Sequence, residues 1–446
     1  MATRELAQFV NSTNFESIPF KVREHSKLML LDWLGVTLAG SKEKIATVMM
    51  DFIMELDGES GSGEATIIGK NVRTDIMKAA LINGSMSHVL DLDDYHGGTL
   101  NHPTVAVLPA ILAVAENKKL GGKDIITALT IAFDVLVRIG YGAGREHYDR
   151  GWHATSTLGK FGATAGVGKL LGLNVEQMIN AFGIAGTLAG GVRQVFGTMG
   201  KSFHAGKASQ DGILAAMLAQ KGFECSKKII EGKHGFMDLF AQKTDFKKML
   251  DNLGKDFYLP TVSFKPYASC GGTHSTIDVM KDIRNNKNFK INEVEEISLE
   301  LGSIALEAAG KVEPATGLEA KFSTYFCAAL ALTEGEAGID KFTDEKANDP
   351  GLNELRKKVK ITILKPDIHL AARAAVKMKD GSILKSKVDV PKGDPANPVS
   401  YLELVNKFNG LAANIISKDK IKTLVEQIKS LENIQNINQL LKLCSV

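Results

Sequence analysis

Histidines and aspartates crowd into one short stretch of the chain, from His88 to His102. The stretch reads HVLDLDDYHGGTLNH, and its titratable members are His88, His96, His102, Asp91, Asp93 and Asp94. An imidazole can take up or release a proton near neutral pH, and burying charged groups is costly unless they are paired. The stretch is therefore the first candidate for a functional site, although solvated loop aspartates and a helix-capping Asp91 are the alternative interpretation.

Cationic and imidazole side chains interrupt apolar sequence at three further places. They are His153 in GWHATST, Lys201 with His204 in GKSFHAGK, and Lys265 with His274 in FKPYASCGGTH. His153 opens a helix rich in small residues, whose N-terminus would favour an anion, although a structural histidine fits this signal equally well. Single lysines are usually only solvated. Together with the carboxylate-rich stretch, these groups suit a substrate that carries several carboxylates.

Elimination of water from a hydroxy-polycarboxylate would use these residue types. A base takes the proton beside a carboxylate, an acid protonates the leaving hydroxyl, and cations hold the developing charge. Histidine can be base or acid, lysine can hold a carboxylate as a point charge, and Asp91 could orient a histidine and set its tautomer. The scheme requires no metal and no cofactor. The expected lysines also argue against a metal at the His/Asp stretch, although such residues can be ligands.

Apolar, helix-like sequence flanks the stretch on both sides. Residues 77–90 and 105–116 carry apolar side chains at helical spacing, and Pro103 suits the first turn of the second helix. Further helices are predicted over residues 19–40 and 125–139. A Gly/Ser turn at Gly58–Gly63 precedes a brief strand or hairpin at Ala65–Gly69.

Glycine, alanine, serine and threonine recur at helical spacing between residues 154 and 222. Glycine within a helix costs about 1 kcal/mol relative to alanine, so many glycines indicate close backbone approach between buried helices. A membrane bundle would look similar. Lys160, Lys169 and Arg193 interrupt these helices, however, which favours a tightly packed soluble domain.

The pattern changes near Phe264, where the alternation typical of strands begins. Residues 294–301 and 358–364 alternate, and two further runs flank Asp380-Gly381, which is a two-residue hairpin signal. Helical periodicity returns from 401 to 443, after a proline-containing linker. We predict a mainly α protein in which a large all-helical domain, residues 1–264 and 401–446, is completed by the C-terminal helices. Residues 265–400 are predicted to form a separate α+β domain.

The overall composition is that of a soluble globular protein. The chain has 446 residues, of which 44% are hydrophobic and 24% charged, and this length suggests two or three domains. A net charge of +3 gives no reason to expect nucleic acid or a membrane surface as partner. Four widely separated cysteines, the lack of a signal-peptide pattern and the shortness of the most apolar run, Val105–Ala115, indicate a cytoplasmic protein.

Six ordered blocks of the chain resemble the MmgE/PrpD family, which includes 2-methylcitrate dehydratase and cis-aconitate decarboxylase. The blocks are HVLDLDDYHGGTLNHPTVAVLPAILA, GWHATSTLGKFGATAGVGKLLGL, GKSFHAGKASQDGILAAMLAQKGF, SFKPYASCGGTH, EAKFS and PKGDPANP. Six blocks in order are far more specific than any one of them. The resemblance implies a large helical domain with an α+β lid, a homodimer, a di- or tricarboxylate substrate and no metal.

The resemblance also assigns site residues position by position. The positions that match the family's catalytic residues are Asp91, His102, His153, Lys201 and Lys265. Other polar side chains near these motifs are predicted to bind the substrate, and they are Asp93, Asp94, Tyr95, His204 and His274.

We expect a metal-independent hydro-lyase of the 2-methylcitrate dehydratase type that acts on a hydroxy di- or tricarboxylate. The alternatives are a decarboxylase of the cis-aconitate type and an epimerase or isomerase, since all begin at a carbon beside a carboxylate. In the decarboxylases that the chain resembles, a Ser-x-x-Tyr pattern follows the EAK block. This chain has Phe326 at the position of that tyrosine, and its own tyrosine, Tyr325, lies one position earlier. One position is about 100° around a helix, which argues against the decarboxylase.

Two rival interpretations come from other classes. The Asp-Leu-Asp-Asp string at Asp91 matches the DxDD string of terpene cyclases, but two tryptophans and no aromatic clustering give little support for a carbocation pocket. A catalytically silent, ligand-binding relative is the other rival, and the five matching positions argue against it. For the enzyme, we expect His102 and His153 to meet across one pocket at the cleft between the domains, with Lys201 and Lys265 as its cationic wall.

Overall fold

The computed structural model describes residues 1–57 and 63–446, and it divides into two compact units. Unit 1 consists of Met1–Val89, Asp93–Ser263 and Ser400–Val446, and unit 2 consists of Leu90–Leu92 and Phe264–Val399. The sequence-based boundaries lay at 264/265 and 400/401, and they did not separate Leu90–Leu92 from the helical part. Of the predicted turn at Gly58–Gly63, only Gly63 lies within the described residues.

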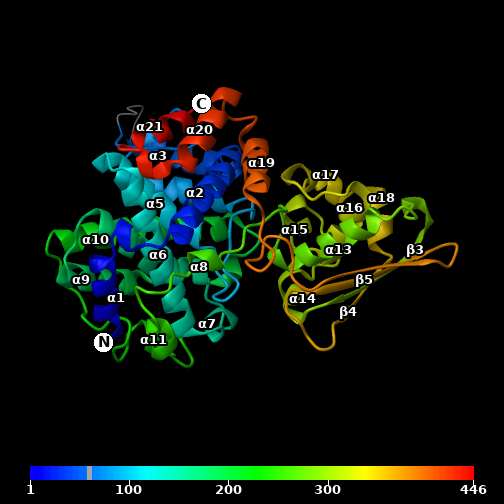
Figure 1. Cartoon of the computed structure of the whole chain (residues 1–446), viewed down its shortest axis with the longest axis horizontal. Helices are drawn as coiled ribbons and strands as arrows, with labels where there is room; N and C mark the ends of the chain where they lie inside the picture. The colour runs from blue at the N-terminus through cyan, green and yellow to red at the C-terminus, as the bar shows by residue number, and fades with distance from the viewer. Residues whose placement is uncertain (58–62) are drawn as a thin grey trace. The chain divides into compact units, whose positions relative to one another are not determined.

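Unit 1 is built from helices (Figure 1). Those before residue 264 are α1 (Ala2–Ser12), α2 (Phe20–Gly40), α3 (Lys44–Asp57), α4 (Ile76–His88), α5 (Pro103–Lys118), α6 (Gly122–Ala143), α7 (Glu146–Asp149), α8 (Ala154–Leu170), α9 (Val175–Leu188), α10 (Met199–Gln220), α11 (Phe236–Phe240) and α12 (Phe246–Leu250). The C-terminal helices are α19 (Tyr401–Ala412), α20 (Lys418–Lys429) and α21 (Asn438–Leu441). A short antiparallel pair, β1 (Ala65–Thr66) and β2 (Arg73–Thr74), precedes α4. The predicted helical class of this part is confirmed.

Local sequence signals set the ends of the helices that border the His/Asp stretch. The carboxylate of Asp75 accepts hydrogen bonds from the backbone N–H groups of Met77 and Lys78 at 2.9 and 3.0 Å, which caps the start of α4. Pro103 occupies the first turn of α5, where its missing N–H leaves no bond unmade. The stretch from Val89 to His102 therefore connects the end of one buried helix with the start of another.

Small residues let α4 and α10 approach backbone to backbone. A Cβ atom added to Gly84 would lie 2.6 Å from the Cα atom of Gly206, and one added to Gly206 would collide with the carbonyl oxygen of Leu81. Both helices also pack against α5, and α10 packs against α8. The close approach inferred from the glycine-rich sequence is thus present at this crossing of α4 and α10.

Helix α6 lies in the core of unit 1. It is the one described helix that is long and apolar enough to cross a bilayer. Of its most apolar 18-residue segment, however, 94% is buried inside the structure. It packs against α5 and α8. An apolar helix that is covered on all sides is a core helix.

Unit 2 combines a four-stranded sheet with helices (Figure 1). Its strands are β3 (Val294–Leu301), β4 (Val359–Ile363), β5 (Ala372–Met378) and β6 (Ile383–Val388), in the order β4-β3-β5-β6. Its helices are α13 (His274–Arg284), α14 (Ser303–Ala309), α15 (Gly317–Ala320), α16 (Thr324–Glu334), α17 (Asp344–Ala347) and α18 (Pro350–Arg356). The predicted strand over residues 294–301 matches β3, and Gly381 turns the β5–β6 hairpin with a φ of 85°. The α+β class of this part is confirmed.

The sheet of unit 2 is mixed. Strand β3 pairs in parallel with β4 and antiparallel with β5, and β5 pairs antiparallel with β6. A parallel pair needs a long connection, and the helices α14 to α18 lie in the chain between β3 and β4. Helix α13 packs on β5 and β6, and it also packs against α16. These contacts bury one face of the sheet.

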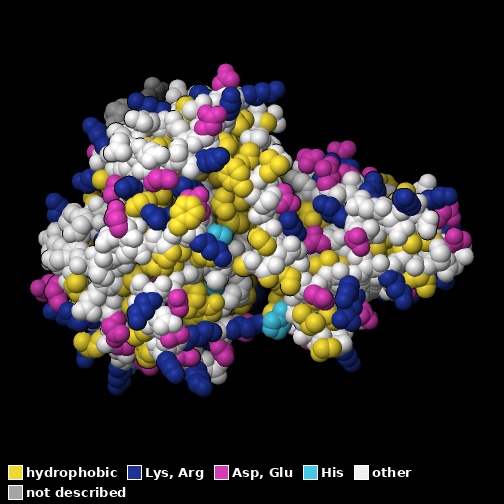
Figure 2. Space-filling model, viewed as in Figure 1, with side chains coloured by type: hydrophobic (Ala, Val, Ile, Leu, Met, Phe, Trp, Pro, Cys, Tyr) yellow, Lys and Arg dark blue, Asp and Glu magenta, His cyan; other side chains and the backbone are white. Residues whose placement is uncertain are grey.

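The C-terminal helices pack on the N-terminal part of unit 1. Helices α19 and α20 both contact α2, and the side chain of Phe408 would lie 3.2 Å from a Cβ atom added to Gly35. Figure 2 shows hydrophobic side chains gathered over α19, where Tyr401 and Leu402 are exposed. Basic and acidic side chains are interspersed over the visible face of each unit, as a net charge of +3 leads one to expect (Figure 2).

Candidate active site

The backbone takes an unusual course inside the His/Asp stretch. Helix α4 ends at His88 and Val89 still belongs to unit 1. Leu90–Leu92 belong to unit 2, and the chain is part of unit 1 again from Asp93. Asp91 has a φ of 53°, in the left-handed region that aspartate tolerates better than most residues. Asp91 and Asp93 thus belong to different units, although they lie only two positions apart in the sequence.

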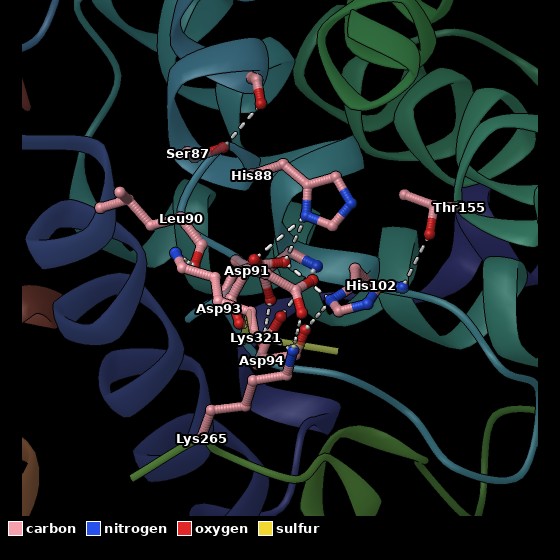
Figure 3. A network of polar contacts seen from close by, with 12 residues as sticks. Ser87, His88, Leu90, Asp91, Asp93, Asp94, His102, Thr155, Lys265 and Lys321 are labelled. Atoms are coloured by element: carbon pink, nitrogen blue, oxygen red, sulfur yellow. Dashed lines mark hydrogen bonds and ion pairs between the residues drawn. The ribbon is translucent and has the colours of Figure 1, made fainter. Parts of the chain in front are cut away.

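Asp93 is the centre of a buried polar network in unit 1 (Figure 3). Its Oδ2 atom lies 2.9 Å from Nδ1 of His88 and 2.8 Å from Nδ1 of His102. The Nδ1 atom of His102 also lies 3.0 Å from the carbonyl oxygen of Asp94, and its backbone N–H donates to Oγ1 of Thr155 at 3.0 Å. The last bond ties the start of α5 to the start of α8. One carboxylate thus orients two imidazoles.

The network defines the protonation of its members. Burial raises the pKa of Asp93, but the His88 and His102 rings outweigh this and hold its pKa well below the ordinary value. An ionised carboxylate can only accept hydrogen bonds, so both histidines present Nδ1–H to it. Burial, with the charges of Lys201 and His102, lowers the pKa of His88 to about 4 against the opposing effect of Asp93. His88 is therefore neutral at pH 7.

His153 lies at the start of α8 and is held from several sides. Its backbone N–H donates to the carbonyl oxygen of Gly191 at 3.0 Å, and its ring stands edge-on to the ring of Phe196 at a centroid distance of 4.9 Å. Its Nδ1 atom lies 2.9 Å from Nδ1 of His204. Burial lowers the pKa of His153 well below the ordinary value, and the charges of His88, Lys201, His204 and His102 act in the same direction. His153 is a buried, neutral imidazole.

The rings of His102 and His153 have a common neighbour, His88. The ring centroid of His88 is 4.5 Å from that of His102 and 6.2 Å from that of His153. Lys201, in the first turn of α10, has its Nζ atom 5.5 Å from the Phe196 ring centroid, and its charge acts on both His88 and His153. Unit 1 therefore brings His102, His153, Lys201 and Asp93 into one cluster, although 48 or more positions separate His153 from the other three.

Two other members of the stretch hold the loop itself. The carboxyl group of Asp94 accepts hydrogen bonds from the hydroxyl and the backbone N–H of Thr104, and burial raises its pKa well above the ordinary value. His96 bonds to Oγ1 of Thr99 at 2.6 Å and to Oγ1 of Thr261 at 3.1 Å, and burial lowers its pKa to about 4. Both side chains thus tie the loop to its surroundings.

Tyr95 continues the loop along a second segment of unit 1. Its backbone pairs with that of Ser263, with bonds of 2.9 and 2.8 Å in the two directions. Its ring centroid lies 6.4 Å from that of His102. Tyr95 is therefore a neighbour of His102 in the histidine cluster.

The remaining predicted site residues lie in unit 2. The Nζ atom of Lys265 lies 3.1 Å from Oδ2 of Asp91 and donates to its carbonyl oxygen at 2.8 Å (Figure 3). Lys321 donates to the carbonyl oxygen of Leu90 at 2.6 Å. Both lysines are buried, and they hold the Leu90–Leu92 segment from two sides. In unit 1, the carboxylate that contacts the Nδ1 atoms of two histidines is that of Asp93.

His274 is fixed within its own part of unit 2. Its Nε2 atom lies 3.2 Å from the carbonyl oxygen of Ser269, and its ring stands edge-on to that of Tyr267 at 5.3 Å. The side chain is buried at the start of α13. The contacts that unit 2 provides are those of a side chain that fastens the loop before α13.

Sequence reasoning gave no site role to three residues that the structure places in these networks. His88 shares the Asp93 carboxylate, Thr155 bonds the backbone of His102, and Lys321 holds Leu90. Signals for all three were present: His88 opens the His/Asp stretch, Thr155 follows His153 by two positions, and Lys321 lies in the EAKFS block. Side-chain type and position alone did not reveal which partners they meet.

The cluster also has the residue types of a metal site. The candidate ligand atoms of His88, Asp93 and His102 lie within 4.8 Å of one another. Both histidines, however, use Nδ1–H to bond Asp93, so these nitrogens offer no lone pair to an ion while the network stands. The nearby charge of Lys201 acts against a second cation. These contacts are those of a hydrogen-bonded cluster beside a positive charge.

Comparisons with known proteins agree with this architecture. A cis-aconitate decarboxylase-like protein, oryM, from Aspergillus oryzae is 29% identical over 99% of this chain and 97% of its own length. Cis-aconitate decarboxylase from Aspergillus terreus is 25% identical over 99% of this chain and 95% of its own length. The mitochondrial 2-methylcitrate dehydratase of Yarrowia lipolytica is 24% identical over 87% of this chain and 79% of its own length.

Two family models together account for most of the chain. The MmgE/PrpD N-terminal domain matches residues 4–249, and the MmgE/PrpD C-terminal domain matches residues 267–433. The second match extends past the α+β part into α19 and α20, which pack in unit 1. With both models matched in order, the chain belongs to the MmgE/PrpD family.

Proposed function

We propose that the chain is a lyase that acts on a small di- or tricarboxylate by acid–base chemistry at a carbon beside a carboxylate. The observation that carries the proposal is the cluster of His102, His153 and Lys201 around the His88–Asp93 pair in unit 1. A positioned imidazole is the commonest acid or base in enzymes, and a lysine supplies the charge that attracts a carboxylate.

Each side chain has a role that follows from its contacts. Asp93 accepts Nδ1–H of His102, which leaves Nε2 of that ring for a substrate and stabilises the imidazolium when it forms. His153 has Nδ1 engaged by His204, so its Nε2 atom is likewise the one left for a substrate. Lys201 provides positive charge in the same cluster. We extend the proposed catalytic roles to Asp91 and Lys265, which pair in unit 2.

Two reactions are candidates, and each has its own support. Decarboxylation of the cis-aconitate type is supported by relatives with that name that match 99% of the chain. Dehydration of the 2-methylcitrate type is supported by the dehydratase relative and by Phe326, which occupies the position of the decarboxylase tyrosine. Phe326 is fully buried, with its ring 6.1 Å from that of Phe342, so this position offers no hydroxyl.

A panel of carboxylates tests the proposal. The purified chain is incubated with cis-aconitate, 2-methylcitrate and citrate in D₂O, and products and deuterium incorporation are followed by NMR, which also detects an epimerase or isomerase. We expect turnover of at least one compound at rates that a chelator does not change. A folded protein that leaves every compound unchanged and undeuterated contradicts the proposal.

We also propose that the chain works as a cytoplasmic homodimer, as the family resemblance implies. Light scattering on the eluted protein measures its mass against the 48.1 kDa of one chain. A mass of two chains supports the dimer. A mass of one chain at the concentrations used in the assays contradicts it.

A further inference from the structure

We propose that His204 is a positioning residue that fixes the tautomer of His153, so that His153 presents a defined Nε2 atom to the substrate. The inference rests on the proposed function, because it gives His204 its meaning through the reaction of His153. It replaces a direct substrate contact, which the sequence suggested for His204, with a role that is exerted through another side chain.

The geometry of the two rings carries the inference. Their Nδ1 atoms lie 2.9 Å apart and their ring centroids 5.2 Å apart, with the planes tilted by 42°. Two imidazole nitrogens at this distance share one proton, because one must donate and the other must accept. Nδ1 of His153 is thereby engaged, and the tautomer of one ring dictates that of the other.

His153 has little freedom to escape this bond. Its backbone N–H is bound by the carbonyl oxygen of Gly191, and Phe196 stands edge-on to its ring. Trp152, one position earlier, pairs with Val192 in a short antiparallel bridge. If the His153 ring flipped while the backbone stayed in place, its bond to His204 would be lost. The bond therefore keeps Nδ1 of His153 towards His204 on α10 and Nε2 away from it.

The surroundings favour a neutral pair. Burial lowers the pKa of His204 to about 4, and the charges of Lys160 and His88 act in the same direction. The Nζ atom of Lys160 is itself held 3.2 Å from Oγ of Ser156 and 3.5 Å from Oδ2 of Asp211, which also pairs with Lys207. Around His153 the charged or titratable neighbours are His88, His102 and Lys201. With Lys160 and Lys201 nearby, a neutral N–H···N bond is the stable form.

His102 and His153 differ in the group that each Nδ1 atom meets, and this difference suits acid–base chemistry. The Nδ1–H group of His102 points at a carboxylate, which stabilises a charged ring, whereas Nδ1 of His153 meets a neutral imidazole. Two histidines in one cluster are thus oriented by partners of different charge. Environments that separate the proton affinities of two groups are what an acid–base pair needs.

Two substitutions at His204 separate this role from packing. Asn places an amide close to the position of Nδ1 and can keep the hydrogen bond, whereas Leu has a similar size and cannot. We expect H204L to lower kcat about 10- to 100-fold, as loss of a partner that orients a functional histidine does, with KM nearly unchanged. We expect H204N to recover most of the loss. An exposed histidine, His234, supplies the control H234N, with unchanged kcat.

The pH profile gives a readout that a packing role would not move. Because His204 contributes to the lowered pKa of His153, H204L is expected to move the His153 limb of the kcat profile to higher pH. A profile of H204L that coincides with that of the unaltered chain overturns the inference, as does an H204N that is as slow as H204L.

An NMR measurement on the unaltered chain is independent of turnover. With ¹⁵N-labelled histidine, the hydrogen bond between the two Nδ1 atoms is expected to show a scalar coupling across the shared proton. The coupling must disappear in H204L. Its absence from the unaltered chain overturns the inference even if a substrate is turned over. Its presence without turnover of any carboxylate supports the tautomer role and counts against the proposed reaction alone.

Discussion

The Oδ2 atom of Asp93 lies 2.8 Å from Nδ1 of His102, and the same oxygen lies 2.9 Å from Nδ1 of His88. A buried carboxylate that accepts from two rings is a stronger constraint than either bond alone, because each ring limits the freedom of the shared oxygen. The side chain of His102 is 17% exposed and that of Asp93 is 2% exposed, so the carboxylate anchors a ring whose far side is accessible. The pair has the geometry of an oriented proton-transfer group.

Substitution of Asp93 by Asn tests this orientation. The Asn amide keeps the size of the carboxylate but loses its charge and half of its acceptor capacity, so His102 can adopt the other tautomer. We expect D93N to lower kcat about 10²- to 10⁴-fold, the usual worth of a positioned proton-transfer group. Steady-state kinetics on the substrate found in the panel measures this. D282N, at an exposed aspartate on α13, is the matched control, and equal rates for both variants would remove Asp93 from the mechanism.

The two histidines themselves give the second prediction. Replacing His102 or His153 by Ala removes a ring that we propose to exchange a proton with the substrate, and kcat should fall about 10²- to 10⁴-fold. The circular dichroism spectrum should keep its helical shape in both variants, since neither ring lies in the apolar core of a helix crossing. Full turnover by H153A would sink the proposed pair.

Much of the fold was predictable because its signals are local. Period-two alternation marked β3, the Asp380-Gly381 turn marked the hairpin, and Pro103 marked the start of α5. Each depends on residues within one element, where backbone geometry and side-chain spacing are linked directly. The confirmed α and α+β classes follow from such patterns.

The site was predictable only in part, because its partners are distant in the sequence. Lys265 meets Asp91 across 174 positions, and Lys321 meets Leu90 across 231. In the Asp-Leu-Asp-Asp string, no local rule says that Asp91 turns to a lysine of unit 2 while Asp93 turns to two histidines of unit 1. A left-handed residue at Asp91 decides this, and its conformation depends on the tertiary contacts around it.

The Lys265–Asp91 pair predicts a stability effect that differs from the effect of an ordinary surface lysine. Both side chains are buried, so K265M removes the ammonium group that lies 3.1 Å from the Asp91 carboxylate. We expect a loss of roughly 3–5 kcal/mol in the free energy of unfolding, the typical cost of breaking a buried pair by removing one partner. Denaturant titration measures it.

A second substitution serves as its control. D91N in the K265M background removes the Asp91 charge, so the double variant should be more stable than K265M alone. If K265M unfolds at the same denaturant concentration as the unaltered chain, the pair contributes nothing to stability.

The contact between α4 and α10 predicts that Gly206 cannot accept a side chain. A Cβ atom there would collide with the carbonyl oxygen of Leu81, and overpacking of this kind costs about 1–3 kcal/mol. Since α10 carries Lys201 and His204, G206A should also lower activity. Gly410, in α19, offers the opposite case, because a Cβ atom there meets open space. G410A should raise stability by about 0.5–1 kcal/mol, and thermal unfolding of the two variants should differ in sign.

Buried neutral histidines predict the direction in which pH changes stability. Burial lowers the pKa of His96 to about 4, against a value of 6.5 in the unfolded chain. Between these two values the unfolded chain binds more protons than the folded one, so the free energy of unfolding rises with pH and falls on acidification through this window. One such group contributes a slope of at most about 1.4 kcal/mol per pH unit.

The difference between the unaltered chain and H96N isolates this contribution from those of other groups. His88, His153 and His204 act in the same direction, whereas the raised pKa of Asp94 favours the folded state at low pH. Asn can keep the bond to Thr99 that Nδ1 of His96 makes, and it has no proton to gain in this range. Urea titrations at several pH values from 7 to 4 should therefore show a shallower loss of stability for H96N. Parallel curves, with the same slope in both proteins, would mean that His96 is already charged in the folded state.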